Sequence, residues 1–221
     1  MPIYKVKKES FFRHWSPEMA YVLGFFAADG SMIRNKRGAH FIEFTSTDRE
    51  LLESIRRLLK SNHKISARER GQKWQTAYRL QIGSKVMFDD LLQLGLTPRK
   101  SKTITFPEIP SPYLSHFVRG YFDGDGNVTS SVYKRANRPG PGRTLLSGFT
   151  SGSRRFLKLL LFQLRRVYGL KGGTLYYSSR GHRLYFSVRD SYRLYNVMYK
   201  NAGDLFLSRK RVVFEKYFGI A

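Results

Sequence analysis

One nine-residue phrase occurs twice in this chain of 221 residues. Residues 22–30 read VLGFFAADG, and residues 118–126 read VRGYFDGDG. In each copy a small residue stands four places after a glycine, and an aspartate and a glycine end the phrase. Glycine inside a helix costs roughly 0.5–1 kcal/mol relative to alanine, so a chain rarely keeps it there without a compensating contact. The repeat therefore predicts two helices whose glycine faces pack together.

Each phrase is expected to form the last turns of a helix. A Ser-Pro pair precedes each copy, Ser16-Pro17 and Ser111-Pro112. Serine is a favoured N-cap, and proline is well tolerated at the first helical position. Gly30 and Gly126 suit the position just past a helix end.

The segments that follow the two phrases also match, which divides most of the chain into two related halves. Three further pairs correspond: 44–59 with 149–164, 78–85 with 182–189, and 96–102 with 207–213. The first pair predicts a strand end, a helix cap and an amphipathic helix, and the second predicts an alternating strand followed by a helix. The offset between matched positions grows from 96 to 110, so the second half contains insertions, chiefly residues 133–143.

Each half is thus predicted as helix, strands, helix, strands, helix, which makes the fold class α+β. We expect an N-terminal half over residues 1–103, a linker over 104–111 and a C-terminal half over 112–221. Proline stiffens such a linker, which should hold the halves close together. Because each half has few strands, the two should complete one pseudo-twofold globular unit.

The charge of the chain indicates its partner. Lys and Arg number 40 against 16 Asp and Glu, a formal net charge of +24 that is spread along the sequence. A folded protein this basic is expected to bind a polyanion, and nucleic acid is the leading candidate. No basic amphipathic helix of the membrane-surface kind is evident, so a membrane partner is not expected.

The absence of cysteine excludes disulfides and zinc–cysteine sites and fits a reducing compartment. No apolar run approaches the length of a membrane span, and the N-terminus lacks the apolar core of a signal peptide. We therefore expect an intracellular protein, in a prokaryotic cytoplasm or an organelle.

Packing the two phrase helices together would bring Asp29 and Asp125 to adjacent C-termini. An anion is disfavoured at the negative end of a helix dipole, and a bound cation would resolve that conflict. Two carboxylates and the last main-chain carbonyls, those of Ala28 and Gly124, are hard oxygen ligands that suit Mg²⁺. A paired acidic metal site on a basic protein is suited to hydrolysis of phosphodiesters.

The two phrases resemble the two motifs of a single-chain LAGLIDADG homing endonuclease. TPRKSK at 97–102 and SRK at 208–210 also match that family, and the resemblance covers the chain from about Ser16 to Phe214. It implies two αββαββα units whose motif helices form the central interface. Two antiparallel β-sheets around them would form a saddle on double-stranded DNA.

The resemblance also implies an enzyme and its chemistry. Asp29 and Asp125 would bind the metal, and Lys100 and Lys210 would polarise water or the scissile phosphate. Mg²⁺ is the expected cofactor; Mn²⁺ or Ca²⁺ could occupy the same site, Ca²⁺ without cleavage. A monomer would cut one phosphodiester in each strand of a long asymmetric site and leave 3′ overhangs. Ala27 stands where the family usually has an earlier aspartate, at a position that is usually not the metal ligand.

Alternation in the strands indicates which side chains would face DNA. Residues 78, 80 and 82 and residues 184, 186 and 188 should face the core, and their neighbours should face outward. The candidate DNA contacts are Arg34, Lys36, Arg37, Glu43, Arg68, Arg70, Lys73, Gln75, Arg79, Gln81, Asn127, Lys134, Arg135, Arg143, Arg180, Arg183, Tyr185 and Ser187. Any one of them is more often a phosphate contact than a base reader.

The insertion at 133–143 is basic and rich in glycine and proline. We expect a loop that is mobile alone and that becomes ordered on the phosphate backbone, because charge without apolar content cannot fold by itself.

Two other functions fit some of these features. A non-cleaving protein on the same scaffold, an intron maturase that binds RNA or a regulator, often lacks a motif aspartate, whereas both are present here. A glycosidase would also use paired carboxylates, but the net charge argues against it.

Overall fold

The computed structural model of the protein describes residues 5–69, 75–136 and 139–220. The first half contains α1 (Pro17–Asp29), β1 (Gly30–Arg34), β2 (His40–Ser46), α2 (Arg49–Leu58), β3 (Ile65–Arg68), β4 (Ala77–Gly83) and α3 (Lys85–Gln93). The second half contains α4 (Leu114–Asp125), β5 (Gly126–Lys134), β6 (Pro141–Ser151), α5 (Arg154–Tyr168), β7 (Thr174–Ser178), β8 (Gly181–Phe186), α6 (Val188–Tyr199) and α7 (Ser208–Phe218). Short 3₁₀ turns lie at Glu9–Phe12 (η1), Lys100–Lys102 (η2) and Ser111–Tyr113 (η3).

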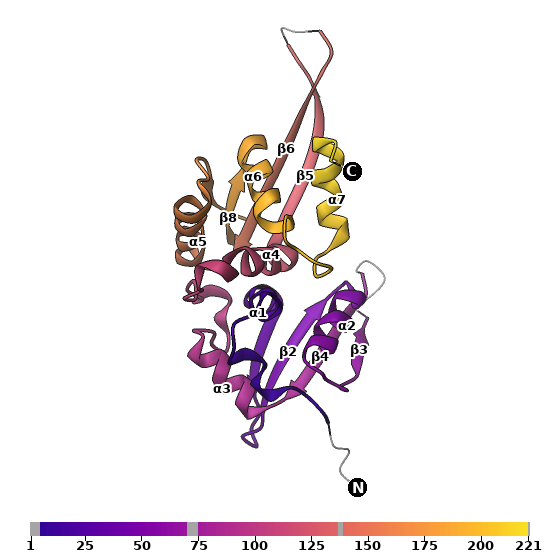
Figure 1. The fold of residues 1–221 in the computed structure, drawn as a ribbon, viewed down its shortest axis with the longest axis vertical. Coiled ribbons are helices and arrows are strands. Elements are labelled where there is room, and N and C mark those ends of the chain that lie inside the picture. Colours follow the sequence, from indigo (N-terminus) through magenta and orange to yellow (C-terminus); the bar gives the residue numbers. More distant parts are fainter. Residues whose placement is uncertain (1–4, 70–74, 137–138, 221) are drawn as a thin grey trace.

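Both halves build the same four-stranded antiparallel sheet. The strand orders are β1-β2-β4-β3 and β5-β6-β8-β7. The sheets lie on either side of α1 and α4, which cross at the centre of the elongated molecule (Figure 1). The predicted α+β duplication is confirmed, with one addition: α7 extends the second half beyond the predicted unit.

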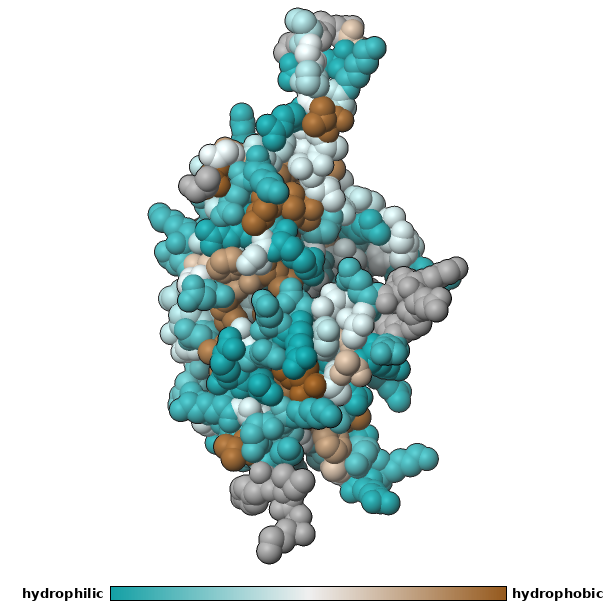
Figure 2. Space-filling model, turned by 90° about the vertical axis from the view of Figure 1, so that its right-hand side faces the viewer, coloured by the Kyte–Doolittle hydropathy of each residue, from teal (hydrophilic) through white to brown (hydrophobic). Residues whose placement is uncertain are grey.

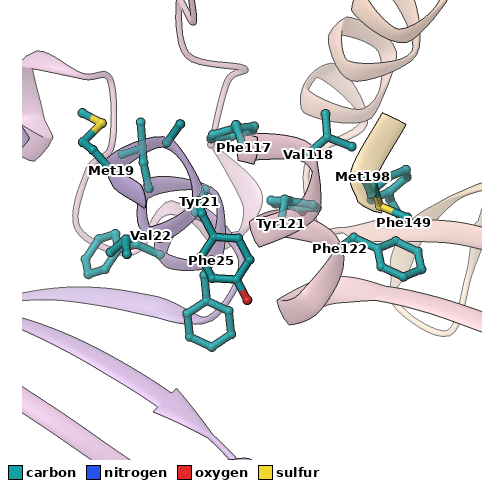
Figure 3. Close-up of a cluster of buried hydrophobic side chains, with 14 of the residues drawn as sticks. Met19, Tyr21, Val22, Phe25, Phe117, Val118, Tyr121, Phe122, Phe149 and Met198 are labelled. Carbon is teal, nitrogen blue, oxygen red and sulfur yellow. The ribbon is translucent and has the colours of Figure 1, made fainter. Parts of the chain in front are cut away.

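The two phrase helices pack backbone to backbone, as the repeat predicted. A Cβ atom added at Gly24 would overlap the carbonyl oxygen of Phe117, and one added at Gly120 would overlap that of Tyr21. Around this contact the apolar side chains of α1 and α4 are fully buried, and Phe149 and Met198 lie beside Phe122 (Figure 3). The glycines are therefore required by the approach of the two helices.

The final glycine of each phrase is required by an aromatic ring. Gly30 has φ −87° and ψ 154°, an extended backbone that any residue can adopt. A Cβ atom there would overlap the ring of Phe26, and one at Gly126 would overlap the ring of Phe122. The ring of Phe26 in turn packs on that of Phe44, and the ring of Phe122 on that of Phe149, with centroid separations of 5.1 and 5.5 Å. These contacts fix each helix end against its sheet.

The predicted helix starts are confirmed in one half and wrong in the other. Ser16 caps α1 by accepting a hydrogen bond from the Met19 amide at 3.1 Å. Ser111 caps nothing, because residues 111–113 form η3 and α4 begins at Leu114. The ring of Tyr113 stacks on Trp15 at 5.9 Å, so this turn packs against the first half before the helix begins.

The predicted strand alternation holds for the middle of each strand and is wrong at one end. Leu80, Ile82, Leu184 and Phe186 are buried, as expected. Tyr78 and Val188 are partly buried and also pack against the core. Val188 does so from outside the strand, because β8 ends at Phe186 and α6 begins at residue 188. The main chain turns there into the helix, whose first hydrogen bond joins the Ser191 amide to the carbonyl of residue 187 at 2.8 Å.

The two ends of the insertion at 133–143, residues 133–134 and 141–143, are paired strands, so the expectation of a loop is wrong for them. β5 continues to Lys134 and β6 begins at Pro141, with Tyr133 paired to Gly142. A Cβ atom on Gly142 would overlap the ring of Tyr133, which lies over the glycine and supplies the packing that the composition seemed to lack. The hairpin projects from one end of the molecule (Figure 1).

Replacing Gly24 with alanine should separate α1 from α4, because the new methyl group meets the Phe117 carbonyl and the Tyr121 amide of the main chain. We expect a loss of about 2–3 kcal/mol in the free energy of unfolding, measured by urea denaturation. Gly83→Ala is the matched control, since a Cβ there would meet the Phe41 ring at an ordinary 3.4 Å. Equal stability of the two variants would show that the helix contact does not need glycine.

Candidate active site

Asp29 and Asp125 lie at the touching ends of α1 and α4. A Cβ atom added at Gly124 would overlap that of Ala28 and would lie 3.2 Å from an Asp29 carboxylate oxygen. Asp29 is exposed and Asp125 is partly buried. Burial, and then the charge of Asp29, raises the pKa of Asp125 to about 7. The two carboxylates are therefore close enough to repel each other, as the sequence predicted.

Lys100 and Lys210 occupy equivalent places beneath these helix ends. The ammonium group of Lys100 donates to the Gly30 carbonyl, and that of Lys210 donates to the Gly126 carbonyl at 2.6 Å. The Lys210 Nζ also lies 2.6, 2.8 and 3.3 Å from the carbonyl oxygens of residues 122, 123 and 124, so its three N–H groups are shared among four acceptors. Both side chains are buried, and burial lowers the pKa of each to about 8 against the opposing charge of the aspartates. In this arrangement the lysines hold the motif-helix ends to the strands that follow them.

Asp123 joins three elements. Its carboxylate accepts hydrogen bonds from the Tyr21 hydroxyl at 2.6 Å and from the Leu207 amide at 3.0 Å, and its Oδ1 atom is buried without a partner. Burial raises its pKa to about 6. It thereby links α4 to α1 and to the start of α7. The pair related to Tyr21 and Asp123 by the duplication is Phe117 in α4 and Ala27 in α1, which cannot form this bond.

Arg119 is a second buried contact that the sequence reasoning missed. Its guanidinium group donates to the carbonyls of Met198 and Leu205 at 2.9 Å and of Ala202 at 3.3 Å. These carbonyls belong to the end of α6 and the segment before α7. Arg119 and Asp123 thus fix the segment that leads to Lys210. A charged residue where the first phrase has Leu23 is the signal that could have revealed it.

A pocket of about 200 Å³ opens beside Asp29. Its other lining residues are Thr45, Ser46, Thr47, Ala77, Asp123, Gly124 and Arg209. Arg209 comes from α7, so the second half contributes a basic group to the pocket of the first-half aspartate. Arg209 is not among the predicted site residues, although it directly precedes Lys210 in the matched SRK segment. The hydroxyl of Ser46 accepts from the Asp48 amide at 3.0 Å and shapes the turn.

The residues at the helix ends fit a hard divalent cation. In the parts of the chain that the structure describes, no group of three or more His, Asp or Glu side chains is placed to hold a metal ion. The possible protein ligands are therefore two carboxylates and nearby main-chain oxygens such as those of Ala28 and Gly124. Mg²⁺ suits such a sparse set, because it retains waters and binds through one or two carboxylates and substrate phosphates.

The predicted DNA contacts lie on the outer face of each sheet or near its turns. In the first sheet Gln81 donates to Glu43 at 3.1 Å, and Arg79 lies 3.7 Å from the same carboxylate. In the second sheet Asn127 donates to the Tyr185 hydroxyl at 2.8 Å, and Tyr185 stacks on Tyr176 at 6.1 Å. Neighbouring side chains of the two outer faces therefore differ in chemistry.

The remaining candidates are more scattered. Arg143 lies over the Tyr217 ring at 5.1 Å, on the α7 side of its hairpin, and Ser187 precedes α6. Arg180 is in the β7–β8 turn. The basic residues Arg34, Lys36, Arg37, Arg68, Lys134 and Arg135, together with Gln75, occupy strand ends and connections, and Arg183 lies on β8. Arg70 and Lys73 lie outside the described residues, and all these contacts stay predictions.

The family model of the LAGLIDADG-like domain matches residues 16–95. The meganuclease I-AabMI, solved bound to uncleaved DNA, is 15% identical, with a TM-score of 0.64 over 93% of this chain and 90% of that chain. I-SmaMI bound to cleaved DNA is 20% identical, with a TM-score of 0.61 over 93% and 88%. The first half thus contains a LAGLIDADG-like domain, and the chain has the two-sheet fold of LAGLIDADG meganucleases, which confirms the resemblance.

No curated protein matches the chain. Among the helices of the described residues, none combines the length and the apolar character that a membrane crossing requires. The face of the molecule in Figure 2 is largely hydrophilic, with hydrophobic residues in small separate patches.

The raised pKa of Asp125 predicts how pH acts on the metal-free protein. Because the native carboxyl binds its proton more tightly than the unfolded one, stability should fall as pH rises from about 4 to 7. Asp125→Asn should remove this loss and stabilise the protein at pH 8 in EDTA by about 1–2 kcal/mol, with a difference that shrinks towards pH 4. Thermal denaturation across this pH range measures it. Asp89→Asn, at a half-exposed carboxylate of α3, is the control. A constant offset between wild type and Asp125→Asn would contradict the repulsion.

Proposed function

We propose that the protein is a Mg²⁺-dependent, site-specific DNA endonuclease. The observation that supports this best is the placement of Asp29 and Asp125 at the touching ends of α1 and α4, midway between two sheets. The chain that carries this acidic pair has a net charge of +24. A basic protein gains affinity for DNA because its binding releases the counterions of the phosphates.

The chain supplies the parts that such a reaction needs. Asp29 and Asp125 would hold Mg²⁺, which when bound supplies Lewis-acid chemistry for phosphodiester hydrolysis. Lys100 and Lys210 keep the helix ends, and hence both carboxylates, in position through their main-chain bonds. Their positive charges would also attract a phosphate of the DNA backbone to the site between the two carboxylates. Arg209, exposed in the pocket beside Asp29, is placed to contact a neighbouring phosphate.

The two sheets would contact the two halves of one DNA site. The first presents Arg79, Gln81 and Glu43 near its centre, and the second presents Asn127, Arg183 and Tyr185. Arginine pairs best with guanine and glutamine with adenine in the major groove, whereas tyrosine offers an apolar ring and one hydroxyl. Different chemistry on the two faces implies a monomer that binds an asymmetric site. One cut in each strand near the helix ends would leave the proposed 3′ overhangs.

Each aspartate should be needed for double-strand cleavage and dispensable for binding. Asp29→Asn and Asp125→Asn keep the size and polarity of the side chain and remove its charge, so they should bind a selected duplex in Ca²⁺ within a fewfold of wild type. Neither should convert plasmid carrying that duplex to linear DNA in Mg²⁺, a loss of at least about 100-fold in rate. Gel electrophoresis of the plasmid follows the reaction.

Asp89→Asn, on the exposed side of α3, should cut like wild type. Normal cleavage by both motif variants would show that the metal site lies elsewhere. Binding by wild type without any cleavage would instead support a regulator or a maturase on the same scaffold.

A further inference from the structure

The hairpin that follows each motif helix differs in length between the halves. β1 and β2 pair over five positions, from Gly30 with Phe44 to Arg34 with His40. β5 and β6 pair over nine, from Gly126 with Phe149 to Lys134 with Pro141. Both ladders start directly after the motif aspartate, so the second hairpin carries four more pairs, nine against five. These pairs, residues 131–134 and 141–144, are the hairpin extension.

The hairpin extension is supported on both of its faces. On one face the Tyr217 hydroxyl of α7 donates to the Arg143 carbonyl at 3.2 Å, and the Arg143 guanidinium lies over the Tyr217 ring. On the other face the Tyr133 ring covers Gly142. The first half has only the short turn η2 at the place that α7 occupies in the second. The longer hairpin and the helix that braces it therefore occur together, in one half only.

The direction of the hairpin extension and its lack of acidic residues suit contact with DNA. It leads away from α4 along the long axis and ends beyond every other described element (Figure 1). Its eight residues include Lys134 and Arg143 and no Asp or Glu, and by strand alternation both basic residues lie on the face opposite to Asn127. By strand alternation its outer face presents Ser131, Tyr133 and Thr144, on the same side of the sheet as Asn127. Serine and threonine hydroxyls can bond to any base or to a phosphate, so this face offers little sequence discrimination.

We propose that the hairpin extension contacts about four base pairs beyond those reached by the rest of the second half. Four strand residues span about 14 Å, and one base pair of B-DNA rises about 3.4 Å, which gives the estimate. The bound site is then longer on one side of the cut than on the other. The added contacts come from hydroxyl groups, and they supply affinity with little sequence preference. This inference rests on the proposed function, because it assumes that the sheets lie along DNA.

A footprint tests it directly. A duplex is selected from a random 40-base-pair library by binding in Ca²⁺, and hydroxyl-radical protection is mapped relative to the cut made in Mg²⁺. Protection should reach about four base pairs further on one side. In a shortened variant, residues 131–144 are replaced by the first-half turn Asn35–Ala39, which Asn35 closes by accepting from the amides of residues 37 and 39 at 2.9 Å. This variant should give equal protection on both sides and cut at the same bond.

Wild type alone provides a second test that needs no altered chain. A duplex trimmed on the longer side to the length of the shorter one should bind roughly tenfold more weakly at about 0.1 M salt. Unchanged affinity, a symmetric wild-type footprint, or an unaltered footprint for the shortened variant would overturn the inference while leaving the endonuclease intact. If no duplex is recovered at all, the proposed function fails, and the inference fails with it.

Discussion

The structure depends on one contact, the crossing of α1 and α4 at Gly24 and Gly120. Each glycine faces a main-chain carbonyl of the other helix, so neither position has room for a Cβ atom. This approach sets the separation of the two sheets and brings Asp29 and Asp125 together at the helix ends. The stability of the central interface and the geometry of the acidic site therefore have the same origin.

The two halves share this contact and differ in what is attached to it. In the second half Asp123 and Arg119 bind the start of α7 and the segment before it. α7 then supplies Lys210 to the end of α4, Arg209 to the pocket beside Asp29, and Tyr217 to the long hairpin. The additional helix α7 therefore contacts both the long hairpin, which makes the two sheets unequal, and the acidic centre. The first half performs the equivalent anchoring with Lys100 on a short turn.

The sequence predicted what depends on repetition and periodicity. The matched phrases were enough to predict both motif helices, their contact and the meeting of the aspartates, and the family resemblance implied the two sheets. It did not predict interactions made by single side chains across long separations, such as Arg119 with the carbonyls before α7. The long hairpin was missed because its composition lacks apolar residues, whereas its packing comes from Tyr133 on Gly142 and from Tyr217. The hydrogen bonds of Lys100 and Lys210 to main-chain carbonyls at the helix ends also have no local pattern in the sequence.

The central claim is that the helix contact creates a cation site between Asp29 and Asp125. The most direct measurement is an anomalous-difference map from a crystal of the protein with a selected DNA duplex and Mn²⁺. The account predicts a peak within direct ligand distance of both helix ends, about 2.0–2.3 Å from a carboxylate oxygen of each aspartate. A map with no peak there, or with peaks only at other acidic side chains, would contradict it.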